Sequence, residues 1–198
     1  MIASMVSSDA TTDGSLLAGD APFAGLEARA VPSFQAIYSE FFRAMWRTLR
    51  RLGVERAQLD DAVQDVFIVV YRRLPEFDGR SLRGWLYAIA VRVASDHRRG
   101  IAQRRSVPLP ETLVDPRPDP AHASELEESV RLLHQLLAEL DEPKRTVFVL
   151  GELEELSVPE IATALAENQN TVASRLRAAR ERFDSAFRRH CARNGGRP

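Results

Sequence analysis

Residues 150–180 have the sequence LGELEELSVPEIATALAENQNTVASRLRAAR, and this stretch decides the fold of the carboxyl-terminal half of the chain. Ser157 followed three residues later by Glu160 forms a capping box, and Pro159 suits the first turn of a helix. A short helix is therefore predicted to start there. A turn at 167–168 leads to a long helix whose inner face carries Val172, Leu176, Ala179, Phe183 and Phe187.

Two helices joined by a tight turn, the second with a polar and basic outer face, are typical of a helix-turn-helix. The second helix of this motif lies in the major groove of DNA and presents side chains near its amino end to the bases. Gln and Asn pair with adenine, and Arg pairs with guanine or phosphate. The candidate DNA contacts are Gln169, Asn170, Thr171, Ser174, Arg175 and Arg177. An ordinary helical hairpin without a DNA role shares the pattern.

Three further amphipathic helices are predicted between residues 33 and 103. Pro32-Ser33 opens the first helix, and Gly53 ends it. Its apolar residues recur at three-and-four spacing, so we expect one buried stripe made of Phe34, Ile37, Tyr38, Phe41, Met45 and Leu49, widened by Phe42 and Trp46.

The second helix is expected from about Arg56 to Leu74, where Pro75 stops it. Its inner face carries Leu59, Val63, Val66, Phe67 and Val70. Asp78-Gly79 forms a turn, and Ser81 caps a third helix that extends to about Arg99. Its core face carries Leu82, Leu86, Ile89, Ala90 and Val93.

A proline-rich segment separates these helices from the carboxyl-terminal ones. Residues 104–122 contain Pro108, Pro110, Pro116, Pro118 and Pro120, which forbid a helix and favour an extended linker. The predicted fold is all-α, with two small helical domains joined by this flexible linker. The expected divisions are a disordered extension 1–32, a domain 33–103, the linker 104–122, a domain 123–190 and a disordered tail 191–198.

The net charge of −1 hides alternating blocks. Residues 33–105 and 158–198 carry +6 and +4, whereas residues 1–32 and 106–157 carry −3 and −8. Basic blocks rich in arginine suit a nucleic acid, although solvated helix faces have the same composition. A further hypothesis is that the acidic segment 106–157 masks the basic blocks within the free protein, more strongly at low salt.

Several classes of function are disfavoured. Cys191 is the single cysteine, and the histidines His97, His122, His134 and His190 lack ligand spacing, so neither a disulfide nor a metal site is expected. No Gly-rich phosphate loop or nucleophile elbow occurs. We therefore expect no catalysis and no cofactor. No apolar run is long enough to span a membrane and no secretory signal is evident, so a cytoplasmic location is expected.

Two groups of motifs resemble conserved regions of extracytoplasmic-function sigma factors of bacterial RNA polymerase. Region 4 is resembled by Leu150–Leu165 followed by Asn170–Arg180, and region 2 by Leu59–Phe67, Tyr71–Gly79 and Trp85–Ala90. Both matches occur in the family's order across the proline-rich segment, and together they cover roughly residues 33–103 and 123–190. The resemblance implies a protein that binds core RNA polymerase and directs promoter recognition, DNA melting and transcription initiation.

The resemblance also implies roles for individual residues. Region 4 recognises the upstream promoter element, and region 2 binds and helps to melt the downstream element through Arg80, Arg83, Trp85, Tyr87 and Arg92, with Arg98 and Arg99 on phosphates. A place in the core remains an equal interpretation of Trp85. The residues that the resemblance assigns to docking on the polymerase β′ coiled coil are Asp60, Asp61, Gln64 and Asp65. The β flap and an anti-sigma factor are further partners that the family implies.

The sequence departs from the family at the helix-turn-helix. Ala166 and Glu167 stand where glycine and an apolar residue are usual, and Ala173 and Ala178 replace common basic residues. These departures leave two alternatives open. One is a helix-turn-helix regulator that is not a sigma factor, although residues 33–103 are too short for the usual α/β receiver domain. The other is a sigma-like interaction protein that has lost promoter recognition.

Overall fold

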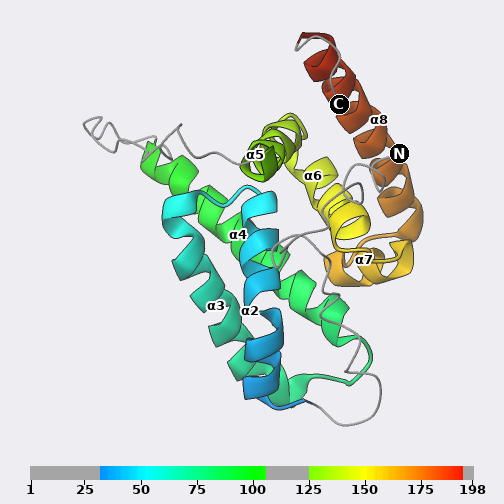
Figure 1. Ribbon diagram of the computed structural model, residues 1–198. Helices are drawn as coiled ribbons and strands as arrows, with labels where there is room; N and C mark the ends of the chain where they lie inside the picture. The colour runs from blue at the N-terminus through cyan, green and yellow to red at the C-terminus, as the bar shows by residue number, and fades with distance from the viewer. Residues whose placement is uncertain (1–31, 106–124, 194–198) are drawn as a thin grey trace.

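The computed structural model describes residues 32–105 and 125–193, which fold into helices joined by short turns (Figure 1). The first unit contains α2 (Phe34–Arg51), α3 (Leu59–Arg73) and α4 (Leu82–Arg105), with 3-10 turns η1 (Arg56–Gln58) and η2 (Leu74–Glu76). The second contains α5 (Glu125–Ala138), α6 (Glu142–Phe148), the π-helical turn η4 (Val149–Leu153), α7 (Val158–Leu165) and α8 (Gln169–Arg193). The prediction of an all-α fold is confirmed.

Helix α2 begins and ends where its sequence signals lie. Ser33 Oγ accepts a hydrogen bond from the Ala36 N–H at 3.2 Å, which caps the amino end. Gly53 follows the helix with a φ of 92°, in the left-handed region that glycine occupies without strain. The helix packs on α3 and α4 through the buried residues Ile37, Phe41, Ala44, Met45, Thr48 and Leu49.

The predicted stripe of α2 is wrong at two positions. Tyr38 and Phe42 are 39% and 36% exposed, because they lie on the side of the helix that turns away from the core. Phe34 and Trp46 are only partly buried. The five residues predicted for the inner face of α3, by contrast, are all buried, namely Leu59, Val63, Val66, Phe67 and Val70.

Two helices are longer than predicted. Helix α4 continues through Gly100 to Arg105 instead of ending near Arg99, since a glycine without positive φ weakens a helix without breaking it. Helix α8 extends to Arg193, three residues beyond the predicted domain end at 190. Most of the predicted linker and of the amino-terminal extension lies outside the described residues.

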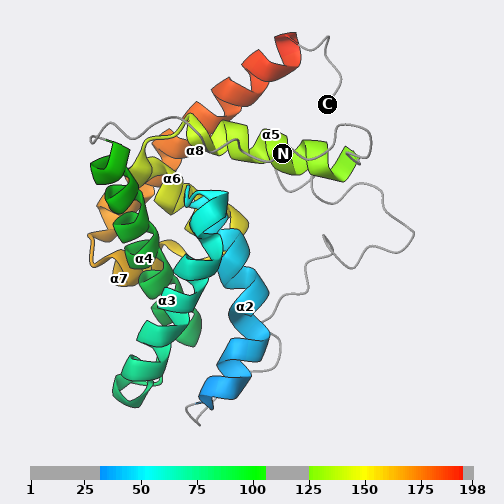
Figure 2. The same cartoon turned by 90° about the vertical axis from the view of Figure 1, so that its left-hand side faces the viewer.

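The two units pack against each other. Helix α4 contacts α2 and α3 on one side and α7 on the other, and the buried apolar residues of both units form one cluster. Figure 2 shows α5 crossing beside the carboxyl end of α2. His134 and Leu137 of α5 line one small cleft together with Arg51 and Val54 of the first unit. The units are therefore joined through space as well as through the chain.

Candidate nucleic-acid interface

The amino end of α8 presents the polar face that the sequence predicts. Asn168 caps the helix, since its Oδ1 accepts a hydrogen bond from the Asn170 N–H at 2.8 Å. Val172 and Leu176 are buried on the inner side. The opposite side is exposed at Gln169, Asn170, Thr171, Ser174 and Arg177. Exposed polar side chains therefore gather at the amino end of α8, the part of the second helix that a helix-turn-helix presents to the bases.

The turn before α8 forms despite the missing glycine. Ala166 adopts the left-handed conformation with φ 53° and ψ 41°, and the Glu167 N–H donates to the Ala162 carbonyl at 2.9 Å. The Glu167 carboxylate pairs with Arg175 at 2.7 Å. The negative charge at this turn is thus neutralised, and the half-buried Arg175 is already engaged.

Further along α8 the arginines differ in their partners. Arg180 forms an ion pair with Glu152 at 2.6 Å, whereas within the described residues Arg177 and Arg182 form no ion pair. Of these three arginines, Arg177 and Arg182 are therefore the two whose charge no carboxylate of the described residues neutralises.

The predicted downstream-element residues do not lie on one surface. Arg80 is exposed in the turn before α4, where its backbone N–H donates to Asp78 Oδ1 at 3.1 Å. Arg92 is exposed on α4. Trp85 is half-buried, and the centroid of its ring lies 5.1 Å from that of Phe77. One part of this side chain therefore packs against the core, and another part remains accessible.

Tyr87 and Arg83 instead face the second unit. Tyr87 is fully buried, and its hydroxyl donates to Glu154 Oε2 at 2.6 Å. Burial and the neighbouring carboxylate raise the pKa of the Tyr87 phenol. The Arg83 guanidinium donates to the Glu154 carbonyl oxygen. In this conformation Tyr87 is inaccessible to DNA, and the half-buried Arg83 guanidinium is engaged by Glu154. The predicted role of Tyr87 therefore requires the units to separate, and that of Arg83 requires its guanidinium to leave Glu154.

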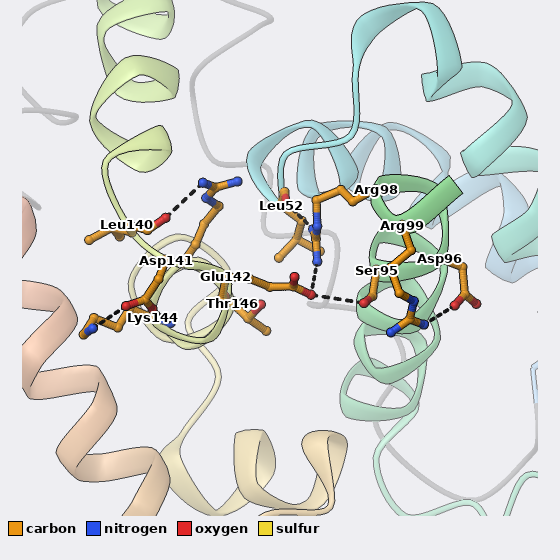
Figure 3. A network of polar contacts seen from close by, with 11 residues as sticks. Leu52, Ser95, Asp96, Arg98, Arg99, Leu140, Asp141, Glu142, Lys144 and Thr146 are labelled. Atoms are coloured by element: carbon orange, nitrogen blue, oxygen red, sulfur yellow. Dashed lines mark hydrogen bonds and ion pairs between the residues drawn. The ribbon is translucent and has the colours of Figure 1, made fainter. Parts of the chain in front are cut away.

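A second polar network joins the units near the end of α4 (Figure 3). Arg98 donates to the Leu52 carbonyl and to Glu142 Oε1, and Ser95 donates to the same Glu142 oxygen at 3.1 Å. Arg99 points elsewhere and pairs with Asp96 on its own helix. Of the two arginines predicted to hold phosphate, Arg98 is occupied by the second unit.

The residues predicted to bind the polymerase are exposed on α3, namely Asp60, Asp61, Gln64 and Asp65. Two of them have partners in the first unit. Asp60 Oδ1 accepts from Trp46 Nε1 at 3.3 Å, and Asp65 Oδ2 lies 2.9 Å from His97 Nε2.

The sequence pattern did not predict an apolar groove that lies beside Asp60 and Gln64. It lies between α2 and α3 and is lined by Phe34, Tyr38, Phe42, Phe67, Ile68 and Tyr71. Its aromatic rings touch, with centroids 4.8 Å apart for Tyr38 and Phe67. The available signal was the number of apolar positions on α2, which exceeds what one core-facing stripe accommodates.

Among the described residues, no group of three His, Cys, Asp or Glu side chains is arranged to hold a metal ion. None of the described helices is both long and apolar enough to cross a membrane.

Comparison with known proteins gives two family matches. The Sigma-70 region 2 family matches residues 37–105, and the Sigma-70 region 4 family matches residues 131–183. RNA polymerase sigma factor NccH of Alcaligenes xylosoxydans is 31% identical over 76% of this chain and 84% of its own length. RNA polymerase sigma-H factor of Pseudomonas aeruginosa is 32% identical over 66% and 73%.

Two solved structures share the fold. CnrH in complex with the cytosolic domain of CnrY has a TM-score of 0.60 at 24% identity, covering 78% of this chain and 86% of that one. The sigma factor RpoE of Bartonella quintana, in complex with the anti-sigma factor NepR, has a TM-score of 0.62 at 18% identity, covering 78% and 96%.

Proposed function

Because this chain belongs to the extracytoplasmic-function sigma factors of RNA polymerase, a family that directs promoter-specific transcription initiation, we propose which of its surfaces carry each part of that task. The observation that carries the proposal is the accessible face at the amino end of α8. Gln169, Asn170, Ser174 and Arg177 are exposed there, while Val172 and Leu176 are buried and anchor the helix. We assign this face to the upstream promoter element as duplex DNA.

The first unit is proposed to hold the downstream element and the polymerase on different surfaces. Arg80, Trp85 and Arg92 are accessible for the melted strand, where an arginine holds phosphate and an aromatic ring stacks on a base. The exposed acidic face of α3 is proposed to dock on the basic β′ coiled coil of core polymerase. Its charges would mainly steer the encounter.

We propose that the chain acts by binding alone and catalyses no reaction. We also propose that it acts in the cytoplasm, where core polymerase is found. An anti-sigma factor is a further proposed partner, since the structure that resembles this fold at a TM-score of 0.62 is a complex with one.

The proposal is tested by in vitro transcription with core polymerase and this chain on a library of genomic fragments. Start sites that occur only when the chain is added are the expected result. No new start site and no association with core polymerase would reject the proposal.

The role of the α8 face is tested on the promoters so found. Arg177→Ala should relax the preference at one base position of the upstream element, because a base contact is lost. Arg188→Ala, the same change at an exposed residue about three turns further along α8, should leave the preference intact. An equal loss on every sequence would mean that Arg177 contacts only phosphate.

A further inference from the structure

Glu154 is a charged residue in an almost closed position between the two units, with 8% of its surface exposed. Its carboxylate accepts three hydrogen bonds from the first unit: from Thr48 Oγ1 at 2.8 Å, from Arg51 Nη1 at 2.8 Å and from the Tyr87 hydroxyl at 2.6 Å. Arg83 binds its backbone carbonyl. We call these four side chains, Thr48, Arg51, Arg83 and Tyr87, the anion cradle.

The local backbone explains why Glu154 reaches the anion cradle. The π-helical turn η4 widens the helix that precedes it, and the Glu154 N–H donates to the Val149 carbonyl at 3.0 Å. Glu155 then has a φ of 54°, a conformation unfavourable for a residue with a side chain. Strained backbone of this kind persists only where the surroundings hold it in place.

The anion cradle has the chemistry of a phosphate site. A guanidinium, a phenol and a hydroxyl converge on one carboxylate, and the same donors bind the oxygens of a phosphate. All four cradle residues belong to the first unit, and in each of these four hydrogen bonds the acceptor atom belongs to Glu154. Withdrawal of Glu154 therefore leaves a preformed site for another anion.

In the second contact between the units, the carboxylate again comes from the second unit and the arginine from the first. Arg98 of the first unit binds Glu142 of the second, and both Glu142 and Glu154 belong to the acidic segment 106–157. Carboxylates of one unit thus occupy arginines of the other at two places. Two of the cradle residues, Arg83 and Tyr87, are also among those that the sequence predicts for the downstream promoter element.

We propose that the anion cradle binds two anions in turn: the Glu154 carboxylate in the free chain, which keeps the units closed, and a phosphate of the melted promoter strand once the units part. The second occupant rests on the proposed function, whereas the first concerns the chain alone. Binding of core polymerase and DNA would then compete with Glu154 for the same donors.

Closure is tested on the full chain without polymerase or DNA. Spin labels are placed at the native Cys191 of α8 and at a Ser39→Cys substitution on the exposed side of α2, and the distance distribution between them is measured. Glu154→Gln removes the charge and should shift the distribution to longer and broader distances. Glu155→Gln, the same change at the exposed neighbour, should match the parent.

Arg51→Gln attacks the same contact from the other unit and should give the same shift as Glu154→Gln. Circular dichroism verifies that each variant keeps its helix content. If one of the two variants is unfolded, the conclusion is drawn from the other. Distributions that stay unchanged in both folded variants would overturn the closure by Glu154.

The second occupant is tested with a short fluorescent oligothymidylate, whose affinity is measured at several salt concentrations. Glu154→Gln should bind it more tightly than the parent. Adding Arg51→Gln should make the slope of log affinity against log salt shallower by about 0.7, the loss of one phosphate contact on a single strand. Adding Arg47→Gln, on the exposed side of α2, should leave the slope unchanged. Equal slopes for the Arg51 and Arg47 variants would reject phosphate binding in the cradle.

The two failures are distinguishable. If no promoter responds to the chain but Glu154→Gln opens it, the function is wrong and the closure stands. If start sites are found but the distance distribution ignores Glu154, the function stands and this inference is wrong.

Discussion

Replacing Ala166 with glycine should stabilise the protein. Ala166 has φ 53° and ψ 41°, and a left-handed conformation costs a residue with a side chain about 1–2 kcal/mol. Glycine avoids this cost but gains freedom in the unfolded chain, which offsets about 0.4–1 kcal/mol. The net stabilisation is therefore about 0.5–1 kcal/mol, which corresponds to a rise in Tm of about 1–4 °C for a chain of this size.

The assay is thermal unfolding of the full chain followed by circular dichroism. The matched control is Ala173→Gly, the same change at an exposed position of α8 with helical backbone. There glycine has no strain to relieve and should destabilise the helix by about 1 kcal/mol. The two variants should thus shift Tm in opposite directions. A lower Tm for both would refute the idea that the helix-turn-helix of this chain is strained at Ala166.

Three further predictions concern other sites. Gly53→Ala should destabilise the protein by about 1–2 kcal/mol in thermal unfolding, because φ is 92° there and a Cβ would meet the Arg145 guanidinium; unchanged stability would contradict this. Burial lowers the pKa of His134 from 6.5 to about 4, so the folded state disfavours its protonation. Stability should therefore be full above pH 6.5 and fall between pH 6.5 and 4, and His134→Gln should reduce that dependence in acid titrations; an identical pH profile would oppose it. Glu167→Gln should release Arg175 for a phosphate and steepen the salt slope of duplex binding by about 0.9, whereas an unchanged slope would mean that Arg175 stays on the protein.

Helix starts were predictable because their signals are local. Ser33, Ser81 and Ser157 each hydrogen-bond within the first turn that follows, so the sequence neighbours carry the whole interaction. The inner face of α3 was predictable for a similar reason, since a single apolar stripe has one side to bury.

The exposed aromatic side chains could not be assigned from the pattern. Tyr38 and Phe42 have the spacing of core residues, but whether a ring is covered depends on which neighbouring helix reaches it. In this fold α3 contributes Ile68 and Tyr71 to the same side, both of them exposed, and no described element covers the groove.

The position of Glu154 depends on contacts that lie far apart in the chain. Its partner Thr48 is 106 residues away along the chain. The charge blocks of the sequence indicate that two segments attract each other, but they do not identify which residues form the contact. The assignment of individual side chains to promoter DNA or polymerase stays a prediction, although the accessible face of α8 has the form it requires.

Helix α4 has a thermodynamic consequence, because it belongs to the packing of both halves at once. One of its sides covers α2 and α3, and another supports α7. Unfolding of either half exposes apolar surface that the other half covers. Heat absorption by the closed chain should therefore occur as one cooperative peak. A chain held open would lose this coupling, and its halves would then melt as separate bodies at their own temperatures.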